Sequence, residues 1–276
     1  MRVTVGGRER IAEAFESARA EGRRAALMPY MMAGFPDLER SLQVARAYVD
    51  GGADLVELGI PFSDPLADGP VIHAAGVAAL RQGVRVGDAL AVTRAIAAEV
   101  PVVVMCYANL VLARGLERFA DVLLDVGASG LIVPDLPLEE APATLEACDQ
   151  RGLALVPLVA PTTPDERLRS IGARARGFLY TVSVTGTTGE RAALGGGLSG
   201  VIARARAQTE VPVAVGFGIA TPEQAASAAA AGADGVIVGS RLVRAAAESE
   251  DPGVAVGDLV RAFAAALRDE SRIPGQ

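Results

Sequence analysis

The sequence predicts a single (β/α)8 TIM barrel, a closed ring of eight parallel strands surrounded by helices, with an extra N-terminal helix. Three observations lead to this prediction. The length of 276 residues suits one such barrel, which typically needs about 250. Apolar residues make up 51% of the chain, enough to fill a large core. Short apolar runs alternate with amphipathic stretches of helix length, and this alternation repeats along the chain.

Eight short apolar runs have the composition of strands that are buried on both faces of a parallel sheet. These runs are residues 26–32, 54–58, 100–106, 130–133, 154–159, 177–182, 211–215 and 235–238.

Helical spacing of apolar residues begins before the first strand, over residues 8–22, and recurs after each strand. The clearest later stretches are residues 38–50, 87–99, 116–126, 138–151, 164–173, 200–209, 222–231 and 254–268. No linker divides the chain, so residues 1–276 are expected to form one domain. An open doubly wound sheet is the alternative, but its Gly-x-Gly-x-x-Gly fingerprint is missing after the first strand, where residues 33–37 read AGFPD.

The composition argues against several function classes. A net charge of −7 disfavours a nucleic-acid-binding role, because the nucleic-acid backbone attracts basic surfaces. No apolar run is long enough to span a membrane, and the N-terminal residues lack the apolar core of a secretion signal. Two cysteines are too few for a disulfide framework, so a reducing cytoplasm is the expected compartment.

The basic residues limit the chemistry further. All 26 are arginine, so a lysine Schiff base and a P-loop are excluded. The single histidine, His73, excludes zinc sites built on two or three histidines. A Ser-His-Asp triad would need the same histidine, and no Gly-x-Ser-x-Gly turn is present. Acid–base chemistry is therefore left to carboxylates, tyrosines and this one histidine.

Glycine-based turns follow the seventh and eighth predicted strands. The first contains Gly216, Phe217 and Gly218, the second contains Gly239 and Ser240, and each leads into a helix. Backbone N–H groups at a helix start can hold a phosphate without a basic side chain, and barrels commonly bind phosphate at this position. A phosphorylated substrate is therefore expected, although glycines there can also serve only to allow tight turns.

Glu57 stands at the C-terminal end of the second predicted strand, among apolar residues. Burying a carboxylate is costly unless it is paired or functional. An ion pair with an arginine would explain it. We favour catalysis instead, because active sites of these barrels sit at the C-terminal ends of strands and because burial raises a carboxyl pKa toward neutrality.

The long loop that follows, residues 59–70, holds Asp64 and Asp68. Each can be a turn former beside proline or glycine, or can act directly in the site. His73 follows the loop where a helix would begin, and we interpret it as a helix-start or packing residue.

Three tyrosines, Tyr30, Tyr107 and Tyr180, fall at or near the ends of the first, third and sixth predicted strands. Their convergence fits a pocket for an aromatic group, although ordinary packing would also account for them.

One long segment makes the chain recognisable: residues 55–70 read LVELGIPFSDPLADGP. Further segments follow the same pattern in order: Pro29-Tyr30, Gly34-Phe35-Pro36-Asp37, Met105-Cys106-Tyr107-Ala108-Asn109, Pro134-Asp135-Leu136-Pro137, Tyr180 through Thr188-Gly189, Gly216-Phe217-Gly218-Ile219 and Gly239-Ser240. Over almost the whole chain, the sequence resembles the tryptophan synthase α-subunit family.

The resemblance implies a lyase of L-tryptophan biosynthesis that cleaves indole-3-glycerol phosphate to indole and glyceraldehyde 3-phosphate in a retro-aldol reaction. It implies that Glu57 is the main acid–base catalyst, that Asp68 binds the indole nitrogen and that Tyr180 lies beside them. The substrate-binding positions that it implies are Tyr30, Met105, Tyr107, Thr188, Gly189, Phe217, Gly218, Gly239 and Ser240.

The resemblance also implies a partner. The family forms an α2β2 heterotetramer with a β-subunit, which carries pyridoxal phosphate, whereas no cofactor or metal is expected in this chain. Asp64, Asn109 and Pro137 match loops that face that partner. Two departures are visible: Phe35 stands where many members have aspartate, and the loop at residues 183–197 ends in a glycine-rich stretch.

The residue inventory suits this reaction. Protonation of indole C3 makes the ring its own electron sink, so carboxylates can cleave the carbon–carbon bond without lysine or metal. Other interpretations remain open at this point: a stand-alone indole-releasing lyase, another phosphate-binding barrel isomerase, a flavin-binding barrel, or a non-catalytic scaffold.

Overall fold

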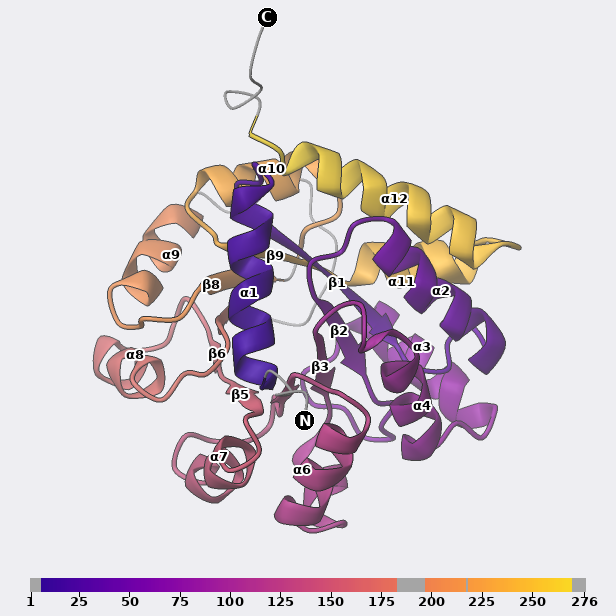
Figure 1. Cartoon of the computed structure of the whole chain (residues 1–276), viewed down its shortest axis with the longest axis horizontal. Coiled ribbons are helices and arrows are strands. Elements are labelled where there is room, and N and C mark those ends of the chain that lie inside the picture. The colour runs from indigo at the N-terminus through magenta and orange to yellow at the C-terminus, as the bar shows by residue number, and fades with distance from the viewer. Residues whose placement is uncertain (1–5, 183–196, 217, 270–276) are drawn as a thin grey trace, which may run out of the picture.

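The computed structural model of the chain describes residues 6–182, 197–216 and 218–269. Its parallel strands form a ring with helices outside it, which confirms the predicted fold class (Figure 1). The strands are β1 (Ala26–Met32), β2 (Val56–Gly59), β3 (Val102–Met105), β4 (Gly130–Ile132), β5 (Ala154–Val156), β6 (Leu158–Val159), β7 (Leu179–Val182), β8 (Val213–Gly216) and β9 (Gly235–Val238). Their order is β5-β4-β3-β2-β1-β9-β8-β7-β6.

The barrel closes through the chain itself at Pro157. The fifth predicted strand, residues 154–159, is divided here into β5 and β6, because proline has no N–H to donate to a neighbouring strand. The Pro157 carbonyl still accepts a hydrogen bond from the Tyr180 N–H at 3.0 Å. The two segments lie at the ends of the strand order, so the peptide linkage between them joins the two edges of the sheet.

The helices follow the predicted pattern with small shifts of their ends. They are α1 (Gly7–Ala20), α2 (Leu38–Asp50), α3 (Pro70–Arg81), α4 (Val86–Ile96), α5 (Ala108–Leu112), α6 (Leu116–Asp125), α7 (Ala141–Asp149), α8 (Asp165–Gly172), α9 (Leu198–Arg206), α10 (Pro222–Ala230), α11 (Ser240–Glu248) and α12 (Pro252–Ala266). Side-chain caps fix several starts: Asp37 accepts from the Arg40 N–H, and Thr221 and Gln224 form a capping box at α10. The short α5 was not predicted, because five residues are too few to show a helical period.

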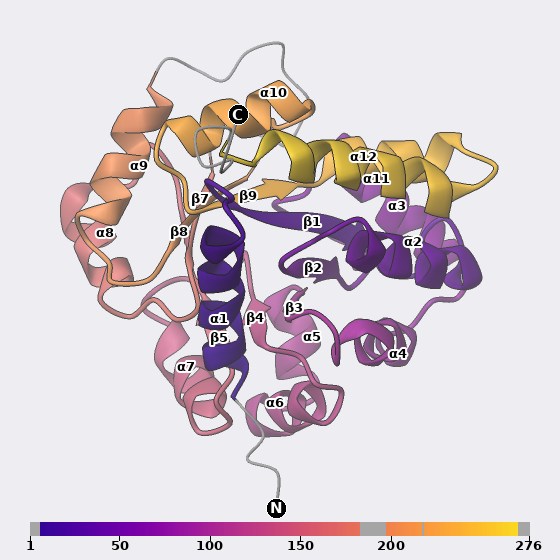
Figure 2. The ribbon, with the colours of Figure 1, turned by 45° about the horizontal axis from the view of Figure 1, so that its top comes forward.

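The extra N-terminal helix, α1, lies across one end of the barrel (Figures 1 and 2). Its Ile11 and Phe15 are fully buried in the cluster that also contains Leu55, Val103 and Phe178. The rings of Phe15 and Phe178 lie 6.1 Å apart between centroids. Each such buried side chain contributes about 1.5–3 kcal/mol of transfer free energy. The opposite end of the barrel, at the C-terminal ends of the strands, carries loops.

The described parts of the chain show neither a membrane-spanning helix nor a cluster of metal ligands. None of their helices has the length and hydropathy that a membrane crossing requires. Nor do they bring together three or more histidine, cysteine, aspartate or glutamate side chains as a metal site would. Cys106 and Cys148 are free and buried.

Candidate active site

Glu57 lies on β2, inside the barrel. Leu55, two residues earlier and so on the same face, belongs to the interior cluster. In the strand pairing, Glu57 stands opposite Tyr30 on β1 and Val103 on β3. The side chain is buried, and its Oε2 atom has no hydrogen-bond partner among the described residues. Burial, with a smaller contribution from the carboxylate of Asp68, raises the pKa of Glu57 from 4.5 to about 8.

A second carboxylate in the barrel shows what a structural acid looks like in this fold. Asp54 precedes β2 and accepts hydrogen bonds from the Arg23 guanidinium and from the Leu27 N–H, both at 2.7 Å. Burial raises the pKa of Asp54 to about 6, and these two partners oppose that shift. The Oε2 atom of Glu57 has no such partner, and within the described residues no arginine forms an ion pair with this side chain.

Asp68 lies in the loop after β2 and is fixed by Tyr107 at the end of β3. The Tyr107 hydroxyl donates to Asp68 Oδ1 at 2.7 Å and accepts from the Ala67 N–H at 3.0 Å. Its ring stacks on Phe62 of the same loop, with 5.1 Å between centroids. Burial raises the pKa of Asp68, while the bond from Tyr107 and the charge of His73 lower it. Tyr107 therefore both holds Asp68 and favours its ionised form.

Tyr30 and Tyr180 each occupy space left by a glycine on the next strand. A Cβ atom on Gly59 would lie 2.1 Å from the Tyr30 hydroxyl oxygen, and one on Gly216 would lie 2.4 Å from that of Tyr180. Burial is the main cause that raises the pKa of both tyrosines, and the charge of Glu57 raises both further. The two hydroxyls are therefore neutral groups beside Glu57.

Some of the remaining residues that were predicted to bind substrate lie in the described parts of the chain, and others do not. Met105, at the end of β3, packs against both the interior cluster and the cluster around Tyr30. Gly218 has a positive φ of 81°, which favours glycine, and Gly239 immediately precedes α11, which begins at Ser240. A Cβ on Gly239 would lie 3.7 Å from the Cβ of Tyr30, so this turn adjoins the catalytic end. Thr188, Gly189 and Phe217 lie outside the described residues.

The three predicted partner-facing residues, Asp64, Asn109 and Pro137, are all exposed on loops or short elements that follow β2, β3 and β4. Two large apolar side chains in the first two of these segments are also exposed, Leu66 at 81% and Leu112 at 62%. Glu57 is buried and Asp68 is half-buried, so these exposed residues differ from the two acids in their access to solvent.

Sequence reasoning assigned no role to two residues that shape the site. His73 is exposed in the first turn of α3, and its charge favours ionisation of Asp68, although its place in the sequence indicated only a helix-start or packing residue. Asp135, after β4, accepts from the Ala108 N–H at 2.9 Å and so fixes the chain directly after Tyr107. A polar residue at the end of a barrel strand was the available signal for Asp135.

Replacing Tyr107 by phenylalanine should change the pH dependence of the reaction. The loss of the hydrogen bond raises the pKa of Asp68, so the acid limb of kcat/KM should move to higher pH, by about one unit for a charge-assisted bond of this kind. The control is Tyr48→Phe, which removes another buried tyrosine hydroxyl bond, to the Tyr30 carbonyl at 3.0 Å. An unmoved acid limb in the Tyr107 variant would show that the hydroxyl does not act on Asp68.

The ends of the strands of this parallel α/β barrel hold two acids, and one of them is buried with an oxygen that has no partner among the described residues. This is the arrangement of an enzyme that works by proton transfer. The family model described as "Tryptophan synthase alpha chain" matches residues 15–269. The chain belongs to this family.

Individual relatives agree with the family model. The tryptophan synthase alpha chain of Methanosarcina acetivorans is 44% identical over 97% of this chain and 96% of its own length. That of Gloeobacter violaceus is 49% identical over 85% and 86%. Among solved structures, a tryptophan synthase of Mycobacterium tuberculosis aligns with a TM-score of 0.87 at 42% identity, covering 94% of this chain and 98% of that chain.

Proposed function

We propose that Glu57 and Asp68 carry the catalytic step of this chain. As a member of its family, the chain is a lyase subunit of tryptophan biosynthesis, and its reaction cleaves indole-3-glycerol phosphate to indole and glyceraldehyde 3-phosphate. The observation that carries the residue assignment is the buried Glu57 carboxyl group, which has a pKa of about 8 and an Oε2 atom without a partner in the described chain.

Glu57 moves the protons in this proposal. With a pKa of about 8 it is mostly protonated near neutral pH, so it can donate its proton to C3 of the indole ring. The carboxylate then takes the proton of the hydroxyl group on the adjacent side-chain carbon. As that hydroxyl becomes an aldehyde, the carbon–carbon bond to C3 breaks and its electron pair restores the aromatic ring. Glu57 gives up one proton and takes up another, so it is protonated again at the end of each turnover.

Asp68 and the glycine turns supply charge stabilisation and binding. Protonation of C3 places positive charge on the indole nitrogen, and an ionised Asp68 stabilises that charge. The bond from Tyr107 keeps Asp68 in place for this. We place the phosphate at Gly218, Gly239 and Ser240, where backbone N–H groups at the start of α11 suit an anion.

Cleavage should need no metal and no cofactor. Protein treated with a chelator and then desalted should release indole from indole-3-glycerol phosphate as fast as untreated protein, because two carboxylates supply the acid, the base and the stabilising charge. Indole release is followed over time in both samples. Activity that the chelator abolishes and a divalent metal restores would exclude this mechanism.

We also propose a β-subunit as partner. A Pyrococcus furiosus structure that aligns with a TM-score of 0.82 at 35% identity is described as a tryptophan synthase a2b2 complex. Exposed Asp64, Asn109 and Pro137, with Leu66 and Leu112 near them in the chain, form the surface that we assign to this contact. Size-exclusion chromatography with the cognate β-subunit distinguishes this complex from a stand-alone lyase. Pyridoxal phosphate would belong to that β-subunit.

Two further assignments accompany this function. We propose that residues 1–276 form one domain, because the fold needs elements from α1 to α12 to cover a single ring of strands. We propose the cytoplasm as compartment, since Cys106 and Cys148 are unpaired and buried, as in proteins of a reducing compartment.

A further inference from the structure

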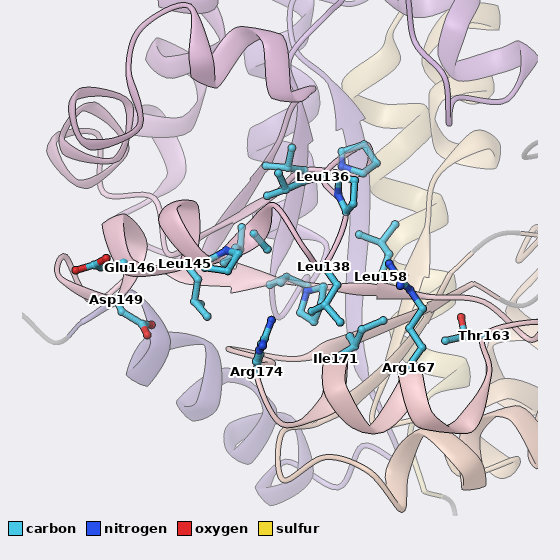
Figure 3. Close-up of a pocket in the computed structure, with 18 of the residues that line it drawn as sticks. Leu136, Leu138, Leu145, Glu146, Asp149, Leu158, Thr163, Arg167, Ile171 and Arg174 are labelled. Atoms are coloured by element: carbon cyan, nitrogen blue, oxygen red, sulfur yellow. The ribbon is translucent and has the colours of Figure 1, made fainter.

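A cavity of about 630 Å³ lies between α7 and α8, on the outer side of the barrel (Figure 3). Its floor includes Pro157, where the sheet is interrupted between β5 and β6. A volume of this size lies within the range of small-molecule sites, which is roughly 300–1,000 Å³. None of the proposed catalytic or substrate-binding residues lines the cavity, and Pro137 is the one residue that it shares with the proposed β-subunit contact.

The walls of the cavity are largely apolar. They come from the loop after β4, from α7, from the strand segments on either side of Pro157 and from α8. The apolar side chains are Val133, Leu136, Leu138, Ala141, Leu145, Leu155, Leu158 and Ile171. Such walls would accept the apolar body of a ligand.

Arg174 points toward the space between α7 and α8 from the end of α8 (Figure 3). Among the described residues its guanidinium takes part in no hydrogen bond and no ion pair. Its charge contributes to the lowered pKa of Glu139. The second arginine of the cavity, Arg167, is already held by Glu139 through two bonds of 2.7 and 3.0 Å. Of the two arginines that line the cavity, Arg174 is therefore the one whose guanidinium has no bonded partner among the described residues.

The acids at the α7 end of the cavity are already engaged. Asp149 accepts from Arg8 at 3.0 Å and from Arg176 at 3.2 Å. Glu146 accepts from the side chain of Gln150 at 3.3 Å. Asp149 is paired with two arginines, whereas Glu146 has only a neutral amide as partner. The positive charge that the cavity offers to a ligand is therefore local to Arg174.

We propose that this cavity is a second ligand site, for a small amphipathic monoanion. The ligand has an apolar body that fills the space between α7 and α8, and one carboxylate or sulfonate group that pairs with the Arg174 guanidinium. Binding here does not depend on the cleavage reaction, because the lining residues and the proposed catalytic residues do not overlap.

The test uses 8-anilinonaphthalene-1-sulfonate, which has an apolar body and one sulfonate, and whose fluorescence rises in apolar surroundings. The chain contains no tryptophan, so protein emission does not obscure the signal. The active site is first filled with an excess of an indole-3-glycerol phosphate analogue that lacks the hydroxyl group on the carbon attached to C3 and so cannot be cleaved. Titration of the full chain should then give saturable binding at one site. Arg174→Gln should weaken this binding about tenfold, the scale of one hydrogen-bonded charge.

Two further variants decide whether the probe occupies the cavity. Ala141→Phe fills the space at the start of α7 and should also weaken binding at least about tenfold. Arg169→Gln, on the exposed side of α8 and outside the lining, should bind as the unchanged protein does. All three variants should keep the cleavage rate and the circular dichroism spectrum of the unchanged chain, which shows that they fold.

Three results distinguish binding in the cavity from non-specific binding and from a general effect of the protein's charge. Binding that does not saturate, or that Arg174→Gln and Ala141→Phe both leave unchanged, overturns the proposal. So does a loss of affinity that Arg169→Gln shares, because that would report only the reduced positive charge of the protein. N-phenyl-1-naphthylamine, the neutral analogue, should bind with an affinity that Arg174→Gln does not change.

Discussion

Glu57→Gln should slow single-turnover cleavage of indole-3-glycerol phosphate by at least about 10²-fold, the usual contribution of general acid–base catalysis. The amide has nearly the same size as the carboxyl group but can neither donate a carboxylic proton nor accept the hydroxyl proton. Because the phosphate is assigned to the turns at Gly218 and Gly239, substrate affinity should change much less than the rate. The loss should therefore appear in kcat and not in the dissociation constant.

Single-turnover rates and equilibrium affinity, measured on the same preparations, separate these effects. Glu166→Gln, on the exposed surface of α8, makes the same chemical change outside the barrel and is the matched control. If the Glu57 variant retains near-normal turnover, or loses affinity alone, Glu57 is a structural carboxylate and the mechanism fails. Ser240→Asp should give the opposite pattern, weaker binding with less effect on the chemical step, because it sets a negative charge against the phosphate.

Asp68→Asn should reduce cleavage by about 10²-fold or more, since removal of a group that stabilises developing charge costs rate on this scale. Asparagine can still accept the hydrogen bond from Tyr107, so the loop should keep its position. What it lacks is the negative charge that balances the indole nitrogen. The variant should therefore bind substrate and fail at the chemical step.

The pH profile of the Asp68→Asn variant should change as well. Since an asparagine side chain does not titrate, the acid limb that Asp68 contributes to the wild-type profile should disappear, leaving a low rate that is flat across that limb. Asp125→Asn, an exposed residue at the end of α6, is the control. A variant with normal kcat at neutral pH would show that Asp68 is only a turn former, which is the alternative that the sequence left open.

The barrel could be predicted because the sequence pattern that produces it is local and recurs along the chain. Short apolar runs and amphipathic stretches alternate along the chain, and the fold follows from their number and order. The break at Pro157 was not predicted, although the residue was visible, because an apolar run on both sides of the proline looked like one continuous strand. Its position at the closure of the ring depends on the whole topology.

The candidate site could be predicted only in part. Glu57 was identifiable because a carboxyl group in an apolar strand is costly and needs an explanation. The contact between Tyr107 and Asp68 joins residues 39 positions apart through a loop conformation that no local pattern determines. The spaces left by Gly59 and Gly216 for two tyrosine hydroxyls likewise depend on the alignment of neighbouring strands.

The buried carboxyl group of Glu57 also has a thermodynamic cost. Its pKa of about 8 in the folded protein exceeds the ordinary 4.5, so the folded state binds a proton that the unfolded state releases between these values. Stability therefore falls as pH rises from about 4.5 to about 8, by up to roughly 5 kcal/mol. Glu57→Gln should melt at a higher temperature than the native chain above pH 8, as thermal unfolding would measure. Selection for thermal robustness alone would favour replacing the residue to which we assign the proton transfers.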